Sequence, residues 1–100
     1  MPATLVAMFE DQTSNADSTA TDFYATVIQV RVWGTFDSAQ VEFKIYDSNR
    51  ADYVILDSTN AVFTAEGSAN IEIPNPSKIR ATLSSAGAST SLSATVTPVR

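Results

Sequence analysis

Neither cysteine nor histidine occurs in this chain of 100 residues. The lack of cysteine excludes disulfides and thiolate chemistry. The lack of histidine excludes imidazole ligands, Ser-His-Asp nucleophiles and a histidine pH switch. Only 17% of the residues are charged, so few groups are left that a catalytic site could tune. We therefore expect that the protein is not an enzyme, and we expect no cofactor and no bound metal.

Basic residues and long apolar runs are also scarce. Six basic residues stand against eleven acidic ones, which gives a net charge of −5. Nucleic-acid binding needs a basic face, so we expect no nucleic-acid partner. No stretch approaches the roughly 20 apolar residues that cross a bilayer, and the apolar run at residues 5–9 is too short for a signal-peptide core. We expect no membrane partner and synthesis in the cytoplasm.

The residues that are abundant favour strands. Ser and Thr together supply 24 residues, and Val and Ile supply 15 against four Leu. Branched side chains fit a pleated, half-buried surface, and no window sustains a helical apolar period. We expect one all-β domain over residues 1–100, an antiparallel β-sandwich or small barrel of about eight short strands. The predicted strands are residues 3–9, 23–33, 40–46, 53–56, 62–65, 69–73, 78–84 and 91–97, with residues 85–88 as a hairpin turn between the last two.

Two segments between the predicted strands carry several acidic residues. Residues 10–22, which precede the predicted strand at residues 23–33, have no large apolar side chain, so we expect a mobile acidic loop there. The segment at residues 47–52 begins like an oxygen-ligand calcium loop. Its sixth position is Asp52, where such a loop needs glycine for its sharp turn. An ordinary turn is therefore the better interpretation of residues 47–52. At another predicted turn, Gly34 supplies a bulge or a positive φ.

Alternation along the second predicted strand gives the candidate contact residues. We assign one face to the core, namely Tyr24, Thr26, Ile28, Val30 and Val32. The other face is mixed and carries Phe23, Ala25, Val27, Gln29, Arg31 and Trp33. Trp33 is either a lid over one end of the core or an exposed anchor for a partner. Alternation also turns Arg80 outward, as a cross-strand charge partner or an interface residue. The candidate protein-interface residues are Gln29, Arg31, Trp33 and Arg80.

Two segments and a closing strand carry a shared pattern, namely residues 30–43, 73–84 and 90–99. The positions of this pattern are Val32, Gly34, Phe36, Ala39, Val41, Asp47, Ser48, the aromatic residue Tyr53, Ile79, Arg80 and Ala81. The pattern resembles that of small β-sandwich structural proteins of tailed bacteriophages, and the resemblance covers roughly residues 28–98. The chain departs from the family pattern at Asn49 and Arg50, where Asp-Gly is common, and Tyr53 stands where the aromatic residue is often tryptophan.

The resemblance implies a structural role in the virion. The leading expectation is a capsid decoration (cement) protein on the capsid exterior. It would be a homo-oligomer, a dimer or trimer, that binds the major capsid protein or other virion proteins through many weak contacts. A neck, tail or fibre-associated protein is the alternative. A carbohydrate-binding module that stacks sugars on Trp33 and on Tyr46 or Tyr53 is a more distant one.

Overall fold

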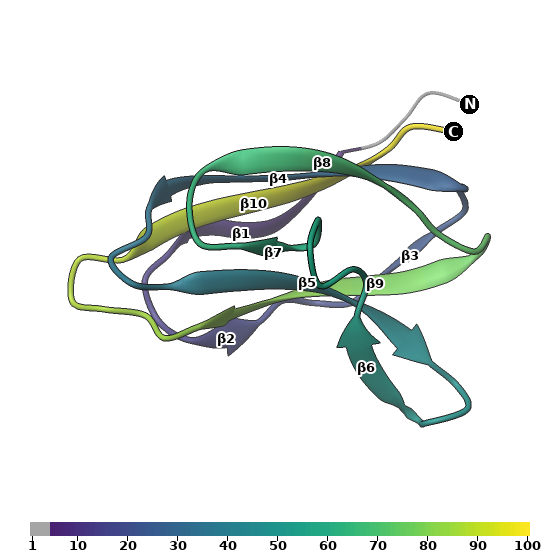
Figure 1. Cartoon of the computed structure of the whole chain (residues 1–100), viewed down its shortest axis with the longest axis horizontal. Helices are drawn as coiled ribbons and strands as arrows, with labels where there is room; N and C mark the ends of the chain where they lie inside the picture. The colour runs from purple at the N-terminus through teal and green to yellow at the C-terminus, as the bar shows by residue number, and fades with distance from the viewer. Residues whose placement is uncertain (1–4) are drawn as a thin grey trace.

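The computed structural model describes residues 5–100. Within these residues, ten strands form two antiparallel sheets that pack face to face (Figure 1). The predicted all-β sandwich is confirmed, with two more strands than expected because short edge strands were missed. The four-stranded sheet contains β1 (Val6–Gln12), β10 (Ser91–Pro98), β4 (Val27–Thr35) and β8 (Gly67–Glu72), in that spatial order. The six-stranded sheet contains β2 (Ala16–Asp17), β3 (Thr21–Phe23), β5 (Gln40–Asp47), β6 (Asp52–Ile55), β7 (Val62–Phe63) and β9 (Ser77–Ser84).

The central strands alternate between core and surface, as the sequence predicts. Each presents every second side chain to the space between the sheets, because successive residues of a strand point to opposite faces. Phe43 is fully buried at the centre, where the ring of Phe63 meets it edge-on at 5.9 Å. The inward residues of the four longest central strands are Ile28, Val30, Val32, Val41, Phe43, Ile45, Ile79, Ala81, Leu83, Leu92, Ala94 and Val96.

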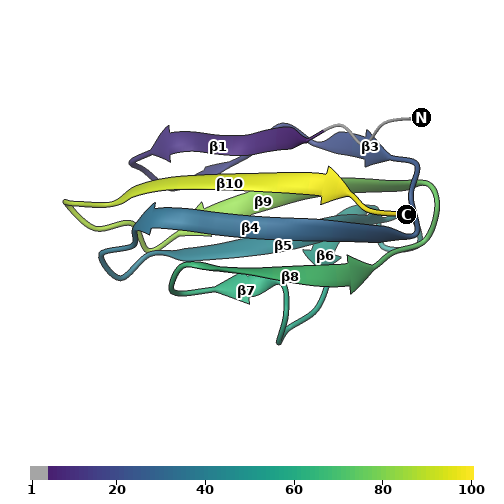
Figure 2. The same ribbon diagram turned by 90° about the horizontal axis from the view of Figure 1, so that it is seen from above.

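In the six-stranded sheet, β9 and β5 are the central pair. Both β2 and β3 pair with β9 on one side, and β6 and β7 pair with β5 on the other. Figure 2 shows the four-stranded sheet in front of the six-stranded one, with β8 and β7 along the same side of the molecule. No helix in the described residues is long and apolar enough to cross a membrane.

The segment at residues 10–22 is more regular than the predicted loop. It contains the end of β1 and the short strands β2 and β3, which pair with β9. Ser18, between these two strands, exchanges two hydrogen bonds with the backbone of Ala81. Its N–H donates to the carbonyl at 2.8 Å, and its Oγ accepts from the N–H at 2.9 Å. Backbone pairing requires no apolar side chain, so the apolar pattern of the sequence does not indicate these strands. The mobility of the segment stays a prediction.

The predicted strand at residues 23–33 is wrong at its beginning. Phe23 ends β3 in the six-stranded sheet, and β4 begins at Val27 in the other sheet. The chain crosses between the sheets there, and the alternation changes phase. Phe23 is 2% exposed and belongs to the core, whereas Tyr24 is 75% exposed and Thr26 is exposed too. The core assignment therefore holds from Ile28 onward and fails before it.

The predicted hairpin at residues 85–88 is also wrong. β9 pairs with β5 and β10 pairs with β4, so the connection passes from one sheet to the other. Thr90 holds this crossing in place, because its hydroxyl donates to the carbonyl of Phe36 at 2.8 Å and accepts from the N–H of Gly87 at the same distance. The first predicted strand also includes Leu5, whereas β1 starts at Val6. Residues 3 and 4 of that prediction lie outside the described residues.

Candidate interaction face around Trp33

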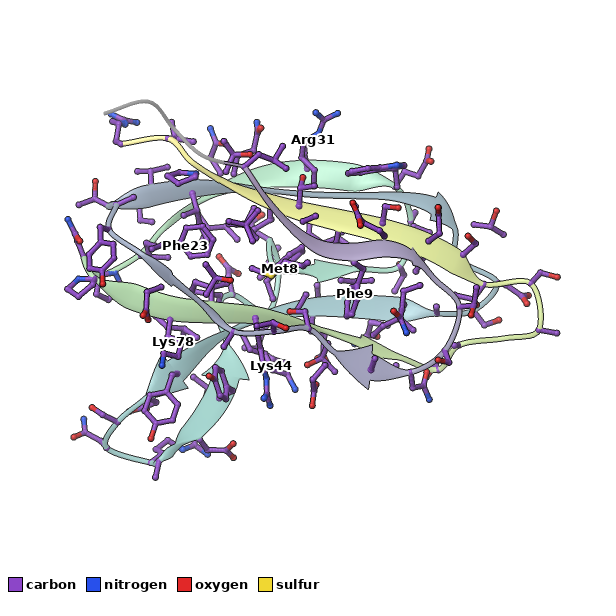
Figure 3. The ribbon with its side chains drawn as sticks, turned by 180° about the vertical axis from the view of Figure 1, so that it is seen from behind. Met8, Phe9, Phe23, Arg31, Lys44 and Lys78 are labelled. Carbon is purple, nitrogen blue, oxygen red and sulfur yellow. The ribbon has the colours of Figure 1, made fainter. Side chains whose placement is uncertain are left out.

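The outer face of β4 carries three of the four candidate contact residues. Gln29, Arg31 and Trp33 alternate with the buried residues of the strand and point away from the core. Trp33 is 44% exposed, so it does not close over the end of the core as a lid would. Figure 3 shows Arg31 projecting from this sheet on the side away from the core residues Met8, Phe9 and Phe23.

Small hydroxyl residues form the floor beside Trp33. In the pairing of β4 with β10, Trp33 lies opposite Ser93 and Arg31 lies opposite Thr95. Both hydroxyl residues are buried although they are on an outer face, and the Ser93 Oγ accepts a hydrogen bond from the Asp11 N–H at 3.1 Å. Their small size leaves a shallow groove of about 680 Å³ between Trp33 and β1. The groove is lined by Leu5, Ala7, Phe9, Glu10, Asp11, Trp33, Ser93 and Thr95.

A second hollow lies on the other side of Trp33, toward β8. Its volume is about 290 Å³. Glu66 stands at this hollow with one carboxylate oxygen, Oε2, accepting from the Gly34 N–H at 3.0 Å. The lining residues are Arg31, Val32, Trp33, Glu66, Gly67 and Ser68. Trp33 therefore forms a ridge between two hollows, and we call this surface the Trp33 face.

The Trp33 face combines an aromatic ridge with charges of both signs. Arg31 forms no ion pair within residues 5–100, and neither do Glu10, Asp11 and Glu66. Tryptophan and arginine, together with tyrosine, are the side chains most enriched among residues that anchor protein interfaces. The shallow hollows suit a polypeptide surface better than a small ligand, which is usually enclosed much more deeply.

Arg80, the fourth candidate, lies far from Trp33. It belongs to β9, on the outer face of the six-stranded sheet, where Figure 3 also places Lys44 and Lys78. Its Nη2 is 3.7 Å from Asp17 Oδ2, and its guanidinium carbon is 3.9 Å from the centroid of the Tyr53 ring. Of the two alternatives for Arg80, the structure therefore favours the cross-strand charge partner.

An aromatic pair lies near Arg80 and does not follow from the sequence alone. The rings of Tyr46 and Tyr53 meet edge-to-face at 5.3 Å, and Tyr46 is 42% exposed. The signal was present in the outward position of Tyr46 on its strand, but the register with β6 was needed to bring Tyr53 opposite it. Trp33 lies on the other sheet, so the three aromatic residues do not form one sugar-stacking platform.

The segment at residues 47–52 forms a turn with its own hydrogen bond. Asp47 Oδ1 accepts from the Asn49 N–H at 2.9 Å, as in an Asx turn. Among residues 5–100 there is no group of three or more His, Cys, Asp or Glu placed to hold a metal ion.

Comparison with known proteins gives a likeness of fold. No family model matches the chain, and no curated protein matches it. Among solved structures, it is similar to the SPBc2 prophage-derived protein YomS, with a TM-score of 0.71. The alignment covers 96% of this chain and 93% of that one at 15% sequence identity. This likeness shows the fold. A second and very different sequence therefore adopts a similar fold over nearly its whole length.

Proposed function

We propose that this protein is a structural component of a tailed-phage virion, and specifically a decoration protein on the capsid exterior. The observation that carries the proposal is the match to a prophage-derived protein over nearly the full length of both chains. The family resemblance of residues 28–98 points to the same class of protein. The capsid position is the finer part of the proposal and rests on that resemblance.

The Trp33 face supplies a contact surface suited to this role. A decoration protein binds a repeated lattice, so each copy needs only a modest patch, and symmetry multiplies weak contacts into stable attachment. Trp33 would enter a depression on the major capsid protein, while Arg31 and the carboxylates around the two hollows fix its orientation. Attachment as a dimer or trimer would raise the avidity further.

Fractionation of phage particles tests the proposal. Particles of the phage that encodes the chain are banded by density and separated into capsids and tails, and each fraction is searched for its peptides by mass spectrometry. We expect the peptides among the separated capsids, with a copy number of the protein that stands in a simple ratio to that of the major capsid protein. Peptides confined to the tail fraction would instead place the protein at the neck, tail or fibre. Their absence from particles would refute a virion role.

The Tyr46–Tyr53 pair keeps carbohydrate binding as a second candidate. An exposed aromatic ring can stack on a sugar ring. Arg80, which lies beside Tyr53, could donate hydrogen bonds to the hydroxyl groups of that sugar. A glycan array probed with the purified protein and with Tyr46→Ala checks this candidate. Binding that is lost in the variant would support it, and binding by neither protein would exclude it.

A further inference from the structure

The edge of β8 is the one long, regular sheet edge in the described part of the chain. The opposite edge of the same sheet is β1, whose pairing with β10 shifts register twice. The edge strands of the other sheet, β2, β3, β6 and β7, have two to four residues each. Short strands and bulges are the usual ways to prevent edge pairing. By contrast, the six residues of β8 pair with β4 in one unbroken register.

The alternation of hydrogen bonds along β8 shows which of its backbone groups point to the free edge. The N–H of Ile73, just beyond β8, donates to the carbonyl of Thr26 at 2.9 Å, whereas the carbonyl of Val27 accepts from Val99 on the β10 side at 2.8 Å. In an antiparallel strand, both backbone groups of a residue point to the same neighbour, and the neighbour alternates. Ile71, Ala69 and Gly67 therefore bond to β4. The N–H and C=O groups of Ser68, Asn70 and Glu72 point to the free edge.

The side chains of β8 do not protect this edge. Ser68, Asn70 and Glu72 are exposed, and the strand contains no proline, no lysine and no inward-facing charge. Glu72 is at one end of the strand and Glu66 lies just before the other. The Glu66 carboxylate turns inward to the Gly34 N–H on β4, so Glu72 is the carboxylate that an added strand would meet, and a basic residue beside it would be favourable.

A ledge lies below the free edge on the core side. It consists of β7 and the preceding residues 56–61, and Figure 2 shows it extending beyond β8. The ring of Phe63 packs under Gly67, since a Cβ on that glycine would stand 3.2 Å from it. A second copy paired through the same edge would bring its own ledge to the same level and compete for this space. A single extended segment needs only the strip along β8 and can rest its inward side chains on the ledge.

We propose that β8 accepts an extended strand of a partner polypeptide, which adds to the four-stranded sheet as a fifth strand. The partner segment has β-branched apolar residues on the side that faces Phe63 and hydroxyl or basic residues on the other. Its backbone bonds to Ser68, Asn70 and Glu72, and a basic side chain at one end meets Glu72. This docking by strand addition is independent of whether the partner is a virion protein.

A seven-residue peptide, KVTVTVK with blocked ends, is the probe for this edge. Its valines lie on one face, and its threonines and lysines lie on the other. We expect that titration of the isotope-labelled protein shifts the amide signals of Ser68, Asn70 and Glu72 and slows their hydrogen exchange. The amides of Ala69 and Ile71 already bond to β4, so their exchange should change little. The charge-reversed peptide EVTVTVE should bind about threefold more weakly, because one of its carboxylates meets Glu72.

A proline at the centre of the edge gives a matched pair of variants. Asn70→Pro removes an N–H that β4 does not use, and proline is tolerated on an edge where that position faces solvent. It should weaken peptide binding about tenfold, whereas Asn70→Thr, which keeps the N–H, should bind as the unsubstituted protein does. Peptide protection of β1 amides instead of the β8 amides would overturn the proposal. So would no binding of KVTVTVK at concentrations up to about 1 mM.

Discussion

Arg80 lies over the ring of Tyr53, with its guanidinium carbon 3.9 Å from the ring centroid. The two residues come from β9 and β6, which do not pair with each other, so the contact bridges across β5 on the outer face of the sheet. The same guanidinium reaches Asp17 on β2. One side chain thus joins the two opposite edges of the six-stranded sheet.

We expect Arg80→Ala to lower the free energy of unfolding by about 1 kcal/mol, which corresponds to roughly 4–8 °C in Tm. The estimate is small because Arg80 and Asp17 are both partly exposed and solvent screens their attraction. Thermal unfolding followed by circular dichroism measures it. Arg31→Ala is the matched control, since Arg31 has no such contacts, and its effect should stay within about 0.5 kcal/mol. Equal losses in both variants would contradict this role of Arg80.

Gly34→Ala should destabilise the protein by more than about 2 kcal/mol. Gly34 has a φ of 120°, which L side chains rarely adopt, and an added Cβ would run into the carbonyl oxygen of Ser91 on β10. Gly67→Ala is the control, because its φ is ordinary and the nearest atoms belong to the ring of Phe63, which can move slightly. Denaturant unfolding of the two variants provides the comparison. A smaller loss for Gly34→Ala than for Gly67→Ala would refute the argument.

For residues 10–22, the sequence predicts a mobile loop, whereas the structure shows short paired strands. Amide exchange distinguishes the two. The Ser18 N–H is bonded to Ala81, whereas Thr13 and Thr19 have no such partner for theirs. We expect the Ser18 amide to exchange markedly more slowly than those of Thr13 and Thr19 in the isolated protein. Similar fast exchange at all three would show that the whole segment is mobile, as its composition suggested.

Asp57 makes the stability depend on pH at the acidic end. The N–H groups of Thr59 and Asn60 donate to its carboxylate, and these bonds lower the pKa of Asp57 below its ordinary value of 3.8. A lowered pKa in the folded state stabilises the fold above the unfolded pKa, and that contribution is lost as the pH falls through the folded value. Asp57→Ala should therefore differ most from the unsubstituted protein near neutral pH and least near about pH 3. Unfolding across this range tests it, and a difference that grows on acidification would contradict it.

Strand alternation predicted correctly which side chains are buried where a strand turns one face to the core. Ile28, Val30 and Val32 are buried because a period of two leaves no other face for them. It failed at Tyr24 because the chain changes sheets there, and no glycine or proline marks the crossing. The connection at residues 85–88 failed for a similar reason, since a Ser, Ala and Gly turn suits both a hairpin and a crossing between sheets.

The surroundings of Trp33 could not be predicted, although its outward orientation could. The groove beside it needs β1 and β10, which are far from Trp33 in the sequence, and the second hollow needs Glu66. Asp17 and Tyr53 likewise meet Arg80 only through the pairing of the strands. Residue type and alternation identify which side chains face solvent. Which of them lie together is decided by register and by the order of strands in each sheet.

Trp33→Ala tests whether the exposed tryptophan serves contact or stability. Because the side chain is 44% exposed and stands on an outer face, we expect its removal to cost only roughly 1 kcal/mol of stability and to leave the β-rich circular-dichroism spectrum intact. Phe43→Ala, at the centre of the core, should cost about 3–5 kcal/mol.

The same Trp33→Ala variant should weaken association with capsids or between copies by about 2 kcal/mol or more, since anchor residues at interfaces typically lose that much on truncation. Co-sedimentation with particles that lack the protein, together with analytical ultracentrifugation of the protein alone, measures the two kinds of association. Tyr24→Ala is the matched control, because Tyr24 is an aromatic residue that is exposed outside the Trp33 face. Unchanged association in Trp33→Ala, or an equal loss in Tyr24→Ala, would remove the Trp33 face as the contact surface. A loss of stability in Trp33→Ala as large as that in Phe43→Ala would show that the tryptophan serves the core after all.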